Sequence, residues 1–212
     1  MPYTGAGIQP AAVPLRCPRC WFTAVFTPIA ALTWRCDRCE WPFTLAAPTL
    51  AAAPAFPATT VAVANPYATP IAATITLNGA TIASFTINGT AAGAITAGTY
   101  ILPAGGTFTA AYTVAAPTWA WALPAVSAGV SAGGTALTFA PASTQALPYA
   151  VGQALIVDPA GASDLVVVSG ATTATSVPVG ALNSAHLTGV LVTVAQTTPV
   201  LSGVEAVPQT SY

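Results

Sequence analysis

Two close pairs of cysteines are the sequence feature that most constrains how this chain folds. They are Cys17 and Cys20, then Cys36 and Cys39, with two residues inside each pair and fifteen between the pairs. Two thiolates at this spacing reach two corners of a tetrahedron from one tight turn, and a second turn supplies the other two corners. This is the spacing of a zinc ribbon. We therefore predict that residues 15–45 form a ribbon in which four sulfurs bind one structural Zn²⁺ per chain.

The basic residues cluster around the same motif. All four of them, Arg16, Arg19, Arg35 and Arg38, stand beside a cysteine. Four thiolates on one Zn²⁺ carry a formal charge of −2, so we expect these arginines to offset that charge and to donate to the sulfurs. The chain between the pairs predicts a hairpin that turns at Pro28. A segment this short can bury only a few apolar side chains. The metal would therefore supply a large share of its folding free energy, about 10 kcal/mol.

Other chemistries of the cysteine pairs remain open. Two disulfides would form if the protein were secreted, because oxidising compartments favour them. A thioredoxin-like redox site is disfavoured, since no βαβ pattern surrounds either pair. Zinc ribbons often bind nucleic acid, but four arginines neutralise few phosphates and affinity scales with that number. We therefore do not expect nucleic acid as a partner.

The composition after the ribbon is that of a weakly charged β protein. Only 4% of residues are charged and the net charge is −1, against about 25% charged residues in typical domains. A surface with so little charge suggests assembly with neighbours or with copies of the same chain. No apolar run of about 18 residues predicts a membrane span. The first residues lack the pattern of a secretory signal, so we expect a reducing site of synthesis.

The remaining pattern predicts a mainly β chain with extended termini. Short alternating segments separated by turn residues are typical of small sandwiches or barrels. Asn78-Gly79 predicts a two-residue hairpin, Asn88-Gly89 predicts a second turn, and residues 181–187 predict one short helical turn. The expected organisation is an extended arm at residues 1–14, the ribbon at 15–45, a Pro- and Ala-rich linker at 46–57, a β domain at 58–122, a second β domain at 123–196 and an extended arm at 197–212.

Candidate functional side chains are few outside the ribbon. His186 is the only histidine, and Asp158 and Asp164 precede it. A catalytic triad could be written from them, but no nucleophile elbow is present, so we expect turn or capping roles and no enzyme activity. Trp119 and Trp121 share one face of a predicted strand. They form either a core plug or a platform for a partner.

Two stretches carry short motifs that go beyond composition. Residues 63–121 contain Asn65-Pro66, Gly93, Pro103-Ala104-Gly105-Gly106, Tyr112-Thr113-Val114 and Pro117-Thr118-Trp119-Ala120-Trp121. Residues 152–194 contain Ile156-Val157-Asp158, Val166-Val167-Val168, Leu182, Ala185-His186 and Gly189. Together they resemble small β domains of structural proteins from tailed bacteriophages, especially those that infect actinobacteria. The ribbon lies outside the likeness.

The resemblance implies a non-enzymatic virion structural protein. It would be a capsid decoration or minor capsid protein that binds and stabilises the head, as a homo-oligomer in contact with the major capsid protein or other virion proteins. Its location would be the virion, assembled in the host cytoplasm. The alternatives are a tail-associated or host-surface-binding virion protein and a zinc-ribbon nucleic-acid-binding protein.

Overall fold

The described part of the chain is all β. The computed structural model describes residues 17, 19–20, 26–30, 32–45, 47–92 and 95–195; for residues 26–30 it describes the backbone alone. These residues form fifteen strands in five sheets, with no helix among them. The prediction of a mainly β chain is confirmed. The two predicted extended arms and Arg16 lie outside the described residues.

The first sheet, which we call the cysteine-bearing sheet, is antiparallel and has the order β1-β2-β3. It comprises β1 (Phe26–Ala30), β2 (Thr33–Cys36) and β3 (Pro42–Thr44). The prediction of a turn at Pro28 is wrong, because Pro28 lies within β1 opposite Trp34. Proline is tolerated there because β1 is an edge strand, where a missing N–H breaks no ladder hydrogen bond.

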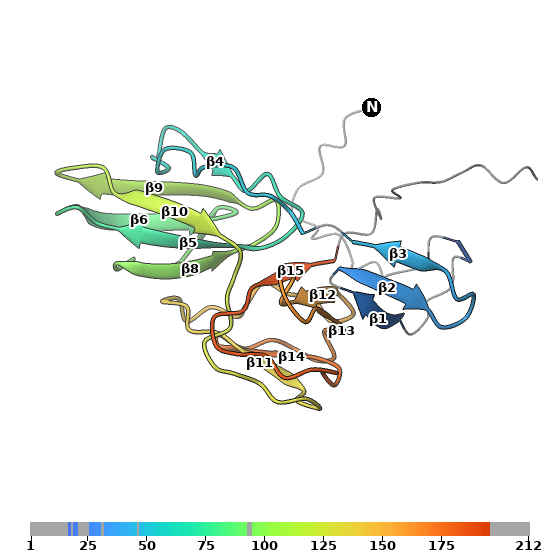
Figure 1. Ribbon diagram of the computed structural model, residues 1–212. Helices are drawn as coiled ribbons and strands as arrows, with labels where there is room; N and C mark the ends of the chain where they lie inside the picture. The colour runs from blue at the N-terminus through green and yellow to red at the C-terminus, as the bar shows by residue number, and fades with distance from the viewer. Residues whose placement is uncertain are drawn as a thin grey trace, which may run out of the picture.

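The first β module packs two sheets face to face (Figure 1). One sheet has the order β10-β5-β8 and the other β4-β9-β6-β7. The strands are β4 (Val63–Ala64), β5 (Ile71–Thr76), β6 (Thr81–Ile87), β7 (Thr90–Ala91), β8 (Gly98–Leu102), β9 (Thr107–Thr113) and β10 (Thr118–Ala122). Ile75 from one sheet and Phe85 and Phe108 from the other are buried in the shared core. The alternating sequence therefore points its apolar residues inward, as period-two patterning requires.

The two Asn-Gly turns of this module have different roles. The turn predicted at Asn88-Gly89 is confirmed, and it joins β6 to β7 as a hairpin. Asn78-Gly79 also forms a turn with positive φ at both residues, but it joins β5 to β6, which lie in different sheets. The predicted hairpin at Asn78 is therefore wrong. The turn instead carries the chain between layers, because the apolar faces of β5 and β6 both point into the core between the sheets.

The second β module comprises a two-stranded and a three-stranded sheet. The smaller sheet pairs β11 (Ala136–Thr138) with β14 (Ser176–Pro178), and the larger has the order β13-β12-β15. Its strands are β12 (Ala154–Val157), β13 (Asp164–Val167) and β15 (Val192–Val194). Leu137, Leu155 and Val177 are among the residues of the core that these sheets share.

The predicted helical turn at residues 181–187 is wrong. Leu182 and His186 lie in an irregular, non-helical segment whose backbone bonds to residues 130–134. The amide of His186 donates to the carbonyl of Val130 at 2.8 Å, and the amide of Val130 donates back at 2.9 Å. Tertiary hydrogen bonds thus satisfy the backbone groups that a helical turn would have paired locally.

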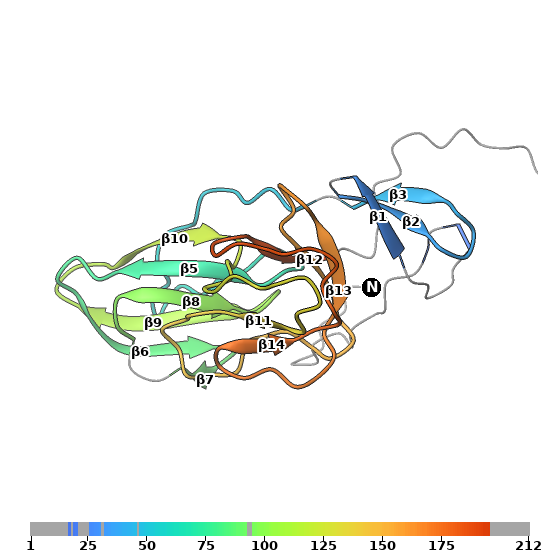
Figure 2. The same ribbon diagram turned by 60° about the horizontal axis from the view of Figure 1, so that its bottom comes forward.

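The cysteine-bearing sheet packs against β12, whose four residues are all buried. Leu155 and Val157 point into the core of the second β module. Ala154 and Ile156, on the opposite face, contact the cluster formed by Trp34, Phe43 and Leu45. The sheet β13-β12-β15 is therefore a middle layer that is covered on both faces, and Figure 2 shows the cysteine-bearing sheet beside β12 and β13.

A buried polar contact joins the two β modules. The hydroxyl of Thr69, in the loop between β4 and β5, accepts from the amide of Val194 at 3.0 Å and lies 3.2 Å from the hydroxyl of Thr193. The carbonyl of Thr69 accepts from the side-chain amide of buried Asn65, which also donates to the carbonyl of Pro103. Asn65 thus holds the loop that attaches the first module to β15.

Candidate metal centre

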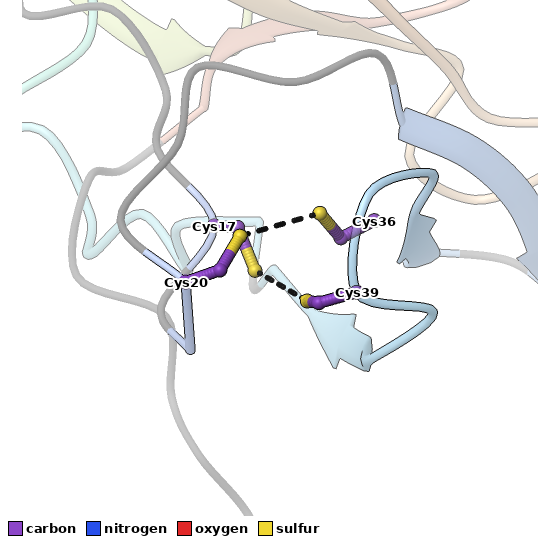
Figure 3. A group of neighbouring side chains, drawn as sticks. All are labelled: Cys17, Cys20, Cys36 and Cys39. Carbon is purple, nitrogen blue, oxygen red and sulfur yellow. Dashed lines mark hydrogen bonds between the residues drawn. The ribbon is translucent and has the colours of Figure 1, made fainter.

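The structure brings all four cysteines together at one end of the cysteine-bearing sheet (Figure 3). Cys36 ends β2 and Cys39 lies in the turn that leads to β3, while Cys17 and Cys20 come from the preceding segment. The four sulfur atoms all lie within 4.8 Å of one another. The Sγ atoms of Cys17 and Cys39 are 3.5 Å apart, and those of Cys20 and Cys36 are 3.8 Å apart. Such a cluster can hold one metal ion.

The turn between β2 and β3 is shaped to present two sulfurs on the same side. The amide of Glu40 donates to the carbonyl of Cys36 at 2.8 Å, and the amide of Cys36 donates to the carbonyl of Trp41 at 3.0 Å. Glu40 has a φ of 56°, the left-handed conformation that closes the turn. Cys36 and Cys39 thereby face the same centre from the two ends of one tight turn.

Without a metal, the thiols differ in acidity. Burial raises the pKa of the Cys17 thiol to about 12, although the amides of Cys20 and Arg19 favour its thiolate. Burial also disfavours the Cys36 thiolate, but the amides of Cys39 and Arg38 and the neighbouring thiols donate to its sulfur, so its pKa is lowered to about 7. The backbone N–H groups of the Cys36–Cys39 turn therefore already favour negative charge, which is the state a metal requires.

Three of the four arginines of the motif belong to the described residues, and all three lie on the surface. The guanidinium of Arg19 stacks over the ring of Trp41, with its Cζ atom 4.6 Å from the ring centroid. Arg19, Arg35 and Arg38 are exposed. The Arg19 contact joins the first cysteine pair to the residue just before β3, a link that the sequence analysis did not anticipate.

Trp119 and Trp121 lie side by side on β10, as the alternation predicted, with ring centroids 5.3 Å apart. Trp119 is buried in the core of the first β module, and its indole N–H donates to the carbonyl of Pro54 at 2.8 Å. The ring of Phe56 packs edge-on against it at 5.0 Å. The segment predicted as a linker thus covers Trp119, and the core alternative describes this residue. Trp121 is half-buried.

His186 and the two aspartates form a group that the sequence analysis assigned only to turns. Asp164 and His186 are buried, and their Oδ2 and Nε2 atoms are 2.9 Å apart. The Oδ2 atom of Asp158 lies 3.9 Å from the Nδ1 atom of His186. The available signal was that these three are the only charged or titratable acid–base side chains between Trp41 and Val204, apart from tyrosines.

The interpretation of the cysteine cluster rests on its geometry, because comparisons with known proteins add no relative to it. No protein-family model, curated protein or solved structure matches the chain. Within the part of the chain that the structure describes, no helix has the length and apolarity needed to cross a bilayer.

Proposed function

We propose that the four cysteines bind one structural Zn²⁺, which makes the cysteine-bearing sheet a zinc ribbon followed by two small β modules. The sulfur cluster carries this proposal. A tetrahedron with Zn–S bonds of about 2.3 Å has S–S edges of about 3.8 Å. Two of the six S–S separations, 3.5 and 3.8 Å, are close to that value, and all six lie within 4.8 Å. Four sulfurs complete the coordination of Zn²⁺, so the site leaves no open position for a reacting water.

The metal would also attach the ribbon to the second β module. Trp34 and Phe43 contact Ile156 from β2 and β3, the two strands joined by the turn that carries Cys39. Zn²⁺ would cross-link that turn to the segment of Cys17 and Cys20, and so hold the apolar face of β2 and β3 against β12. Burial of the fully enclosed Trp34 and Ile156 then adds to the stability that the metal supplies.

We further propose that the protein is a non-enzymatic structural subunit of a phage particle, as a capsid decoration or minor capsid protein. The resemblance of the two β stretches supports this role, as does the charged fraction of 4%. Exposed apolar side chains also support assembly, among them Val114 and Leu187, which are 92% and 80% exposed. Neighbouring subunits that cover such side chains would gain the free energy of burying them.

Native mass spectrometry of the purified protein, with and without a chelator, tests both parts of this proposal. We expect a homo-oligomer with one zinc per chain. A mass lower by four hydrogens, without metal, would mean two disulfides and would remove the zinc site. A zinc-bound monomer that does not co-sediment with phage heads would keep the metal site but reject the capsid role.

A second candidate is the host-surface-binding role, which a cavity between the two β modules favours. The cavity has a volume of about 530 Å³ and is lined by uncharged side chains, including Asn88, Gln145, Tyr100 and Tyr149. Hydroxyl and amide groups beside aromatic rings suit a neutral ligand such as a saccharide. Saturation-transfer NMR with neutral oligosaccharides tests this role: signals lost in Gln145→Ala would support it, and no transfer to any oligosaccharide would reject it.

A further inference from the structure

His186 is the only positive counter-charge that most of this chain can offer. All four arginines lie at or before position 38, and the chain has no lysine in any later position. In the 174 residues that follow Arg38 (212 minus 38), His186 is the one side chain able to carry positive charge. Two of the five carboxylates of the protein face it, Asp164 from β13 and Asp158 from the turn after β12.

Hydrogen-bond donors surround the carboxyl group of Asp164. Its side chain is fully buried. Its Oδ2 atom accepts from the amide of Ser184 at 2.9 Å, and its Oδ1 atom accepts from the side-chain amide of Asn183 at 3.3 Å. The Nε2 atom of His186 is 2.9 Å from the same Oδ2. N–H groups thus donate to both oxygens of this carboxylate. The charge of a buried carboxylate requires a counter-charge.

The imidazole of His186 is placed to supply that counter-charge. Its side chain is fully buried, and with Nε2 directed at Asp164 its Nδ1 atom has no hydrogen-bond partner among the described residues. A neutral ring with its proton on Nε2 would leave a buried lone pair on Nδ1, 3.9 Å from the Asp158 carboxylate. A proton on Nδ1 would replace that unfavourable approach with an attraction, because both ring nitrogens of imidazolium are donors.

The turn that carries Asp158 is built to hold its carboxylate near the ring. Asp158 has a φ of 57°. Its carbonyl accepts from the Ser163 hydroxyl at 2.9 Å and from the Gly161 amide at 3.1 Å. The carboxylate lies over Gly161, where an added Cβ would be only 2.4 Å from Oδ2. Only glycine therefore allows Asp158 to keep this position, 24% exposed at the edge of the buried pair.

We propose that His186 is a proton-operated clamp: as imidazolium it bridges Asp164 and Asp158 and fastens the 183–187 segment to the 158–164 turn. The charged groups that face the ring are these two carboxylates, and the remaining contacts on Asp164 come from neutral Asn183 and Ser184. Loss of the proton as the pH rises removes the counter-charge of a buried carboxylate. The clamp then opens, and the pairing of Val130 with His186 loosens with it.

NMR of the imidazole nitrogens tests the clamp directly, and the assignment is unambiguous because the chain has one histidine. In full-length folded protein we expect a pH range in which both ring nitrogens are protonated. A rise in pH should bring loss of the Nδ1 proton together with faster amide hydrogen exchange at Val130, Ser184 and His186. A ring that is never doubly protonated in folded protein, or hydrogen exchange that does not follow the loss of the Nδ1 proton, overturns the proposal.

Two isosteric variants separate the clamp from a merely structural hydrogen bond. Asp158→Asn keeps the shape of the turn but removes the charge that faces Nδ1, so the pH at which the ring loses its proton should fall, by about one unit for a tenfold weaker preference for imidazolium. Ser163→Ala, in the same turn, removes a hydrogen bond without changing charge and should leave that pH unchanged. Equal titration of wild type and Asp158→Asn overturns the role of Asp158 even if both proteins are fully folded.

Discussion

The cysteine-bearing sheet and the first β module are both antiparallel, yet they are held together in different ways. The first β module encloses a core of its own, in which Phe85 and Phe108 stack at 6.3 Å. The cysteine-bearing sheet has three strands of five residues or fewer, and the residues that bury Trp34 and Phe43 include Ala154, Ile156 and Ala195 of another module. A sheet this small encloses no core of its own, so its stability depends on the apolar face of β12 and, in our proposal, on the metal bound by the four cysteines.

Removal of the metal should produce the largest difference in stability between the cysteine-bearing sheet and the first β module. We expect a chelator, or Cys36→Ser, to unfold residues 33–44, because structural zinc supplies on the order of 10 kcal/mol to domains of this kind. Hydrogen exchange should show loss of protection in β2 and β3 with little change in β5 and β9. Chelator added to Cys36→Ser serves as the control and should have no further effect. Equal loss of protection in β9 would show that the modules do not fold separately.

A cavity in the first β module should destabilise that module and leave zinc binding by the cysteine-bearing sheet intact. Phe108→Ala removes a fully buried ring and should lower the free energy of unfolding of this module by about 3–5 kcal/mol. Zinc content, measured by mass spectrometry, should stay at one per chain, because Phe108 contacts none of the cluster around Trp34. Loss of zinc from Phe108→Ala would show that the cysteine-bearing sheet depends on the first β module for its stability.

Two adjacent residues of β12 distinguish the core of the second β module from the contact with the cysteine-bearing sheet. Leu155→Ala and Ile156→Ala each delete a fully buried side chain and should cost about 2–5 kcal/mol in zinc-bound protein. Leu155 faces the core of the second β module, whereas Ile156 faces the cysteine-bearing sheet. In chelated protein the cost of Leu155→Ala should persist, and that of Ile156→Ala should fall sharply. Denaturant unfolding of both variants, with and without chelator, measures the difference, and equal costs in chelated protein would count against the docked layer.

The smallest expected effect comes from the cation–π contact beside the cysteines. Arg19→Ala removes the guanidinium from the Trp41 ring and should weaken zinc binding by about two- to five-fold, as expected for an exposed pair. Competition with a chromophoric chelator measures this change. Arg35→Ala is the matched control, because Arg35 is also exposed and also stands beside a cysteine. Equal weakening by both variants would point to a general charge effect.

Local patterns predicted the parts of the fold that depend on neighbours in sequence. The spacing of the cysteines identified all four members of the sulfur cluster, because a tight turn fixes where two sulfurs two residues apart can point. Alternation predicted that Trp119 and Trp121 share a face, and the predicted turn at Asn88-Gly89 is confirmed. Each of these follows from backbone geometry over a few residues.

Contacts between distant segments decided what local patterns could not. Asn78-Gly79 is the same dipeptide as Asn88-Gly89 and also has positive φ at both residues. Its flanking strands do not pair with each other, because β5 pairs with β10 and β8 whereas β6 pairs with β9 and β7. The turn chemistry specified a reversal of the chain; the choice of partner depended on which arrangement buried Ile75 and Phe85 in one core.

Local sequence patterns were therefore sufficient to predict a mainly β chain with one four-cysteine cluster and very little charge. Contacts between distant residues explain why β12 is covered on both faces, why Pro54 and Phe56 cover Trp119, and why His186 faces Asp158 and Asp164. The physical reason is that burial and hydrogen bonding are satisfied by whichever groups come together in space. For Asp164 that partner lies 22 residues away, and no local pattern identifies it.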